Sequence, residues 1–180
     1  RFGFSDAKRV LFESDEDFMA AYRAAVKEYR AVRCEIDTQL DVLRQQQGID
    51  LNEAVSATQL KQWLVEIPQD LHAKETSLRL HMDGFTASRE LRVGDVLAVP
   101  LLTPHALQHG VRTIEFQTPV YERKILSFAQ KVLTQNHWDT DEALQLAQLH
   151  IPVDDVFPVL HNADGVKIER IVAFDDFTVQ

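Results

Sequence analysis

The sequence has a single cysteine, Cys34, among its 180 residues. One thiol excludes an intrachain disulfide and a cysteine-rich zinc module, and it favours a reducing compartment. No apolar run approaches the roughly 18 residues of a membrane-spanning helix, and no signal peptide is visible. We therefore expect a cytoplasmic protein that has no membrane partner.

Basic residues are outnumbered: 19 Lys and Arg stand against 28 Asp and Glu, for a formal net charge of -9. Such a surface repels a phosphate backbone, so we expect no nucleic-acid partner. A local basic group can still hold a small phosphorylated substrate. The hydrophobic share of 45% is enough for a substantial core, and no repeat, low-complexity tract or linker divides the chain. These features predict one domain over residues 1–180.

Capping signals and apolar spacing predict helices in the first third of the chain. Ser14 followed by Asp17 is typical of a helix start. Apolar residues then recur at spacings of three and four from Phe18 to Leu43, which predicts one helix, or two abutting helices, ending near Gly48.

Two further helices follow from the same signals. Ser56 with Gln59 opens a short helix that Pro68 stops, and Asp139 opens another over residues 140–149. The apolar spacing of residues 125–133 fits a strand or a helix and does not decide between them.

The middle of the chain favours strands. Leu78, Leu80 and Met82 alternate with polar residues that include His81, and residues 83–84 read Asp-Gly, a typical hairpin turn. We therefore interpret His81 as a strand histidine that faces solvent. Further strands are predicted over residues 85–91, 96–99 and 112–117, and over 167–174 after a turn at 162–165.

One stretch, residues 94–107, carries the strongest functional signal. A Gly94-Asp95 turn feeds an apolar strand, the strand stops at Pro100, and His105 follows a short loop and starts the next strand. That layout delivers one imidazole from the wall of a β-barrel toward its interior, and neutral imidazole is the commonest protein metal ligand. The alternative is a loop histidine that only holds the turn.

Three polar residues downstream could also line a site. Glu115 and Gln117 point to the same face of the predicted strand, where they line the barrel interior or face solvent. Arg123 is either part of a surface charge pair or a charged fork that holds a phosphate or a developing enediolate oxygen.

Taken in order, these residues resemble the second conserved motif of the cupins and, more narrowly, the type I mannose-6-phosphate isomerase family. The similarity is best over residues 1–8 and 90–125, and the matching positions are Pro100, Thr103, His105, Ala106, Gly110, Glu115, Gln117 and Arg123. The resemblance implies a mainly β, cupin-type jelly-roll barrel, whole or fragmentary, in a single cupin-like domain over 1–180. Its parts would be a helical insertion at 14–67, barrel strands at 76–133, and a C-terminal helix and strands at 134–180 or the start of a second barrel there.

The resemblance also implies a function: metal-dependent aldose–ketose isomerisation of a sugar phosphate, an intramolecular oxidoreductase reaction. His105 would be a zinc ligand, Arg123 the catalytic arginine, and Thr103, Glu115 and Gln117 pocket residues, with Glu115 orienting His105 or a metal-bound water. The family's other ligands, a glutamine and a histidine two apart and then a glutamate, have no match here and are expected outside this chain. The alternative is a non-catalytic cupin sugar-binding or regulatory module. The general base and the oligomeric state are left unassigned.

Overall fold

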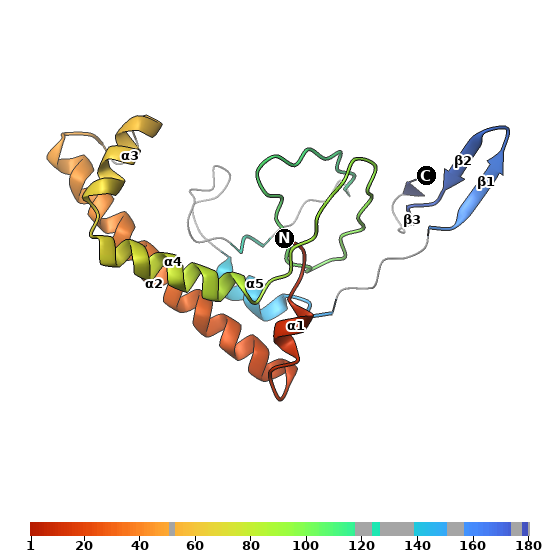
Figure 1. The fold of residues 1–180 in the computed structure, drawn as a ribbon, viewed down its shortest axis with the longest axis horizontal. Coiled ribbons are helices and arrows are strands. Elements are labelled where there is room, and N and C mark those ends of the chain that lie inside the picture. Colours follow the sequence, from red (N-terminus) through yellow and green to blue (C-terminus); the bar gives the residue numbers. More distant parts are fainter. Residues whose placement is uncertain (51–52, 118–123, 127–138, 151–156, 174–177, 180) are drawn as a thin grey trace. The chain divides into compact units, whose positions relative to one another are not determined.

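The computed structural model describes residues 1–50, 53–117, 124–126, 139–150, 157–173 and 178–179 (Figure 1). Of the described residues, 46% are helical and 11% lie in strands or bridges. The chain divides into two compact units. Among the described residues, one unit comprises Arg1–Phe4 and the described parts of Ala87–Leu126 and Asp139–Gln180, and the other comprises the described parts of Ser5–Thr86.

The expected mainly β, cupin-type barrel is wrong. The described strands form two separate antiparallel pairs, β1 (Val159–Ala163) with β2 (Val166–Glu169) and β3 (Val172–Ala173) with β4 (Thr178–Val179). Residues 85–117 contain no regular strand, so the strands predicted over 85–91, 96–99 and 112–117 are absent. In that segment, His105 forms an isolated antiparallel bridge with Phe2.

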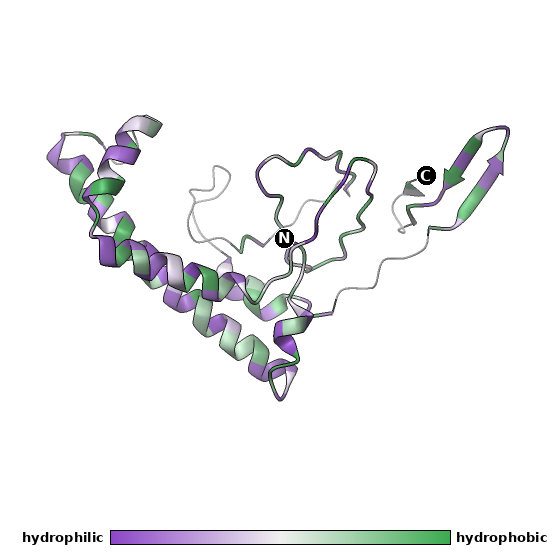
Figure 2. Cartoon of the chain, viewed as in Figure 1, coloured by the Kyte–Doolittle hydropathy of each residue, from purple (hydrophilic) through white to green (hydrophobic). Residues whose placement is uncertain are grey.

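The helical unit is built on a long helix, α2 (Asp15–Gln46), which packs against α4 (Gln69–Asp83) (Figure 1). Ser14 caps α2 as predicted, since its Oγ accepts a hydrogen bond from the Asp17 N–H at 3.1 Å. The sequence left open one helix or two abutting helices, and α2 is a single continuous helix that ends at Gln46. Alternating bands of hydropathy along α2 (Figure 2) reflect a buried apolar face formed by Phe18, Met19, Tyr22, Ala25, Val26, Tyr29, Val32 and Ile36.

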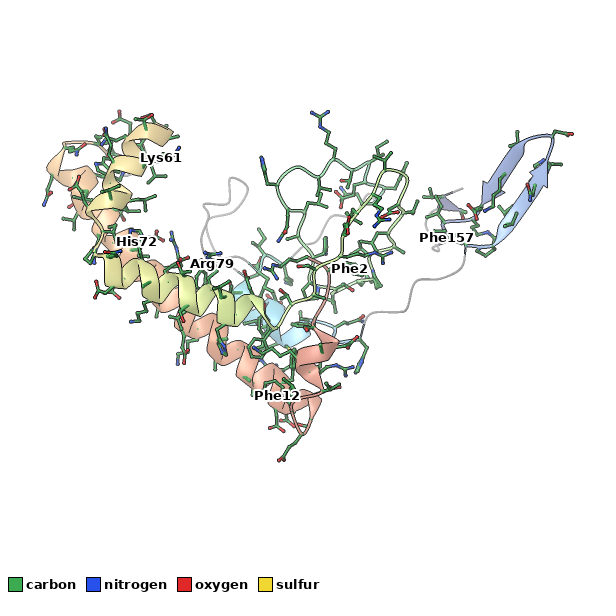
Figure 3. All side chains as sticks on the ribbon, viewed as in Figure 1. Phe2, Phe12, Lys61, His72, Arg79 and Phe157 are labelled. Atoms are coloured by element: carbon green, nitrogen blue, oxygen red, sulfur yellow. The ribbon has the colours of Figure 1, made fainter. Side chains whose placement is uncertain are left out.

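The short helix α3 (Ala57–Glu66) also begins where the sequence predicts. The Ser56 Oγ accepts from the Gln59 N–H at 3.1 Å, and the helix ends before Pro68, the N-cap residue of α4. Near the start of α4, the Nε2 of His72 (Figure 3) lies 2.7 Å from the carbonyl oxygen of Leu64. A carbonyl only accepts, so this ring nitrogen donates and joins α4 to the end of α3.

Residues 76–83, predicted as a strand that turns at Asp83-Gly84, are the second half of helix α4. A strand would put Leu80 and Met82 on the same face, but Leu80 is 62% exposed and Met82 is 8% exposed. Met82 instead shares a buried helical face with Leu71, and Gly84 is the C-cap of α4. His81 is exposed, as expected, but it is helical.

An aromatic cluster around Phe85 lies where the end of α4 packs against the start of α2. The Phe85 ring is 1% exposed, and its centroid lies 5.3 Å from that of Phe18 and 5.4 Å from that of Tyr22. On the short helix α1 (Asp6–Arg9), Lys8 places its Nζ 3.9 Å from the Phe85 centroid, a cation–π contact. His81 meets the same ring edge-on at 5.5 Å. Phe85 therefore joins α1, α2 and α4.

A polar cluster sits farther along the α2–α4 contact. The Tyr29 hydroxyl donates to the Glu75 Oε1 at 2.9 Å, and the Arg79 Nε lies 3.4 Å from the same oxygen. Tyr29 is 4% exposed, and burial, with the hydrogen bond to Glu75, raises its pKa to about 12. Tyr29 is therefore a protonated phenol in the folded α2–α4 pair at neutral pH.

The pKa of Tyr29 predicts a loss of stability in alkali. The pKa is raised from 10.0 to about 12 in the folded state, so the stabilising effect is complete below pH 10 and is lost as the pH rises to 12. Tyr29→Phe should cost about 1 kcal/mol at neutral pH, the loss of one hydrogen bond. The unfolding free energy of Tyr29→Phe should also fall less steeply than that of the wild type as the pH rises in alkali. Urea midpoints of both proteins across this range check the prediction, and parallel pH curves would contradict it.

The other unit contains the predicted C-terminal helix, α5 (Thr140–Leu146), which is shorter than the expected 140–149. Asp139 does not cap it with its side chain. The Asp139 Oδ2 instead accepts from the Ile125 N–H at 2.9 Å, and Lys124 Nζ pairs with Glu142 Oε1 at 2.9 Å. These contacts tie residues 124–125 to the first turn of α5.

The predicted turn at 162–165 is confirmed. Asp164 and Gly165 have φ angles of 54° and 76°, the two positive values that a tight hairpin turn requires, and they join β1 to β2. The strand predicted over 167–174 is divided between β2 and β3, and its last residue, 174, lies outside the described residues.

Candidate functional site

The turn that precedes the candidate site forms as predicted. Gly94 has a φ of 95°, a conformation that favours glycine. Next to it, the Asp95 Oδ2 accepts from the Arg92 N–H at 2.8 Å, and the Asp95 N–H donates to the Arg92 carbonyl at 3.0 Å. The aspartate therefore closes the turn.

A second turn follows at residues 100–103. The Thr103 N–H donates to the Pro100 carbonyl at 3.3 Å. Between them, Leu102 has a φ of 61°, which costs a residue with a Cβ about 1–2 kcal/mol. The Leu102 carbonyl accepts from the Gln148 N–H, just beyond α5, at 3.0 Å. The turn is thus strained, and a distant backbone group bonds to its strained residue.

The backbone immediately before and after His105 is bonded to the first residues of the chain. The Gly3 N–H donates to the Pro104 carbonyl at 2.7 Å, and the Ala106 N–H donates to the Arg1 carbonyl at 3.0 Å. Phe2, between these residues, donates its N–H to the Ala87 carbonyl at 3.0 Å. Residues 1–3 therefore lie between residue 87 and residues 104–106, and His105 is held at the backbone on both sides.

The imidazole of His105 has a defined orientation. Its Nδ1 lies 2.8 Å from the Thr103 carbonyl oxygen. The carbonyl can only accept, so Nδ1 carries the proton and Nε2 keeps its lone pair when the ring is neutral. Histidines that bind metals use this arrangement, in which one ring nitrogen donates to a carbonyl or carboxylate and the other ligates. The exposed ring of His105 is therefore suited to offer Nε2 as a ligand.

Thr103 is buried, with 5% of its surface exposed, and its Oγ1 has no hydrogen-bond partner within the described ranges. An unpaired buried hydroxyl normally costs about 1–3 kcal/mol. The sequence singled out Thr103 as a pocket residue. The structure gives its carbonyl a second role, because that carbonyl orients His105.

A complete metal site is not formed by the described residues, among which no three His, Cys, Asp or Glu side chains gather as a possible ligand set. Zinc needs three or four protein ligands. Here His105 Nε2 can supply one metal ligand, and the remaining ligands would have to come from outside the described residues.

Within the described residues, no hydrogen bond or ion pair joins Glu115 or Gln117 to His105. Glu115 and Gln117 are exposed, and so are Ile114 at 87% and Phe116 at 66%, so the two faces expected of a strand there do not exist. The roles given to Glu115 and Gln117 stay predictions. Arg123 lies outside the described residues.

Two residues that sequence reasoning missed bear on the geometry of His105: Leu102, through its positive φ, and Gln148, through its N–H. Neither carries a local signal. Leucine rarely adopts φ > 0, and a backbone donor is the same in every residue except proline.

No helix among the described residues is both long enough and apolar enough to cross a membrane. Comparison with family models, with curated proteins and with solved structures found no match to this chain.

Proposed function

We propose that this chain contributes His105 as a metal ligand to a metal-dependent isomerase that interconverts aldose and ketose forms of a sugar phosphate, of the mannose-6-phosphate isomerase type. The observation that carries the proposal is the hydrogen bond of 2.8 Å between His105 Nδ1 and the Thr103 carbonyl, which leaves Nε2 available. The proposal depends on the chemistry of residues 94–123 and not on a barrel.

The reaction moves hydrogen between adjacent carbons. The proton on C2 of the aldose leaves, and a proton is added to C1. The C2 hydroxyl proton is transferred to the oxygen on C1, which gives the ketose with its carbonyl at C2. A divalent metal, zinc in this proposal, would polarise the two oxygens when bound. From this chain, His105 would hold the metal through Nε2, and Arg123 would donate two hydrogen bonds to the developing negative charge.

The role of Arg123 predicts a specific kinetic defect. Arg123→Lys keeps the positive charge but loses the planar pair of donors, so kcat should fall by about 10²-fold, as for the loss of one electrostatic stabiliser. The adjacent substitution Lys124→Arg is the matched control and should keep wild-type turnover. Equal kcat for wild type and folded Arg123→Lys would remove Arg123 from the proposal.

The proposed function is tested with the intact protein that contains this sequence, loaded with zinc and given mannose 6-phosphate. Fructose 6-phosphate should form, and a chelator should stop its formation. If the protein binds the sugar phosphate without converting this or any other hexose or pentose phosphate, the isomerase proposal fails, and the protein is a non-catalytic sugar-binding or regulatory module.

A further inference from the structure

The ring orientation of His105 depends on the backbone of a strained turn. The acceptor for Nδ1 is the Thr103 carbonyl, and the direction of that carbonyl follows from the conformation of Leu102 and Thr103. Leu102 has a φ of 61° and is 47% exposed, so burial of its side chain does little to hold it there. A strained residue persists only where its surroundings hold it.

The backbone group that bonds to Leu102 comes from a part of the same unit that is remote in the sequence. Ala147, the C-cap residue of α5, turns the chain out of the helix with φ and ψ of -56° and 128°. The next residue, Gln148, then directs its N–H to the Leu102 carbonyl at 3.0 Å. The Gln148 side chain is exposed. The Gln148 N–H, and not its side chain, is therefore the relevant group.

We propose that Gln148 and Leu102 are positioning residues that hold His105 in the Nδ1–H tautomer, so that the segment after α5 determines which ring nitrogen can bind a metal. The Gln148 N–H fixes the Leu102 carbonyl, Leu102 keeps its positive φ, and the Thr103 carbonyl then faces His105 Nδ1. This inference rests on the proposed function only for the use of Nε2; the tautomer itself is a property of the metal-free protein.

The matched pair Gln148→Pro and Gln148→Ala isolates the backbone donor. Proline removes the N–H, and the extended conformation of Ala147 is the one that a residue before proline prefers. Alanine keeps the N–H. Long-range ¹H–¹⁵N spectra of the histidine rings in the metal-free intact protein, at about pH 9, where imidazoles are neutral, report the tautomer directly.

The wild type and Gln148→Ala should show His105 protonated on Nδ1. In Gln148→Pro, the ratio of the Nδ1–H to the Nε2–H form should fall by about tenfold, the factor expected for the loss of one hydrogen bond. A wild-type ring protonated on Nε2, or equal ratios in the alanine and proline variants, would overturn the inference.

A second pair tests the strained residue and does not depend on the folding of Gln148→Pro. Leu102→Val places a β-branched residue where φ is positive and should release the turn, with the same shift toward Nε2–H. Leu102→Asn, a residue that tolerates positive φ, should keep the wild-type tautomer. An unchanged tautomer in Leu102→Val would contradict the proposal. Zinc-dependent turnover, measured separately, tests the proposed function, so either idea can fail without the other.

Discussion

Replacing His105 with alanine should remove most of the zinc from the intact protein. The substitution deletes one ligand, and loss even of a group that only supports a ligand weakens metal binding by about 10–100-fold, so a ligand should cost more than about 100-fold. Elemental analysis after dialysis against a metal buffer measures this effect.

The matched control is His109→Ala. His109 is exposed, lies in the same segment and has no assigned role. This variant should retain the zinc content of the wild type. Equal zinc in wild type and His105→Ala, or equal losses in the two alanine variants, would exclude His105 as a specific ligand.

Replacing Phe85 with alanine should destabilise the helical unit by about 3–5 kcal/mol. The ring is 1% exposed and contacts aromatic side chains of α2, including Phe18 at 5.3 Å. Alanine would leave a cavity between the helices and would abolish the cation–π contact with Lys8. Urea unfolding followed by far-ultraviolet circular dichroism gives the change in unfolding free energy.

Leu80→Ala, in the last turns of α4, is the control for this measurement. Leu80 is 62% exposed, so its truncation should change the unfolding free energy by less than about 0.5 kcal/mol. If both variants unfold at the wild-type midpoint, Phe85 does not join the helices in solution.

Local signals in the sequence predicted the features that local chemistry determines. Ser14 and Ser56 are N-caps because a hydroxyl two or three residues before an unpaired N–H satisfies it wherever the rest of the chain lies. Gly94 marks a turn because its φ of 95° is unfavourable for other residues. The turn predicted at 162–165 is also correct, and it joins β1 to β2.

Features that depend on remote partners were not predictable in this way. The pattern over residues 78–82 fits both a strand and a helix, and the burial of Met82 but not Leu80 decides between them. A strand needs a neighbouring strand, and the sequence does not show that residues 96–99 and 112–117 lack one. Asp83-Gly84 is a good hairpin signal, but Asp83 is the last residue of α4 and Gly84 is its C-cap.

The candidate site also combines residues that local signals predict with contacts that remote parts of the chain determine. The sequence singled out His105 and Thr103 by residue type and spacing. The tautomer of His105 depends on a backbone carbonyl, and that carbonyl depends on a strained Leu102 and on the Gln148 N–H, which no sequence pattern reveals.

The most direct test of the central claim, that His105 binds metal through Nε2, is a zinc titration of the intact protein with ¹⁵N-labelled histidine. One equivalent of zinc should shift the His105 Nε2 resonance, while Nδ1 stays protonated and hydrogen-bonded to Thr103. A His105 Nε2 resonance that is unchanged at saturating zinc would contradict the account.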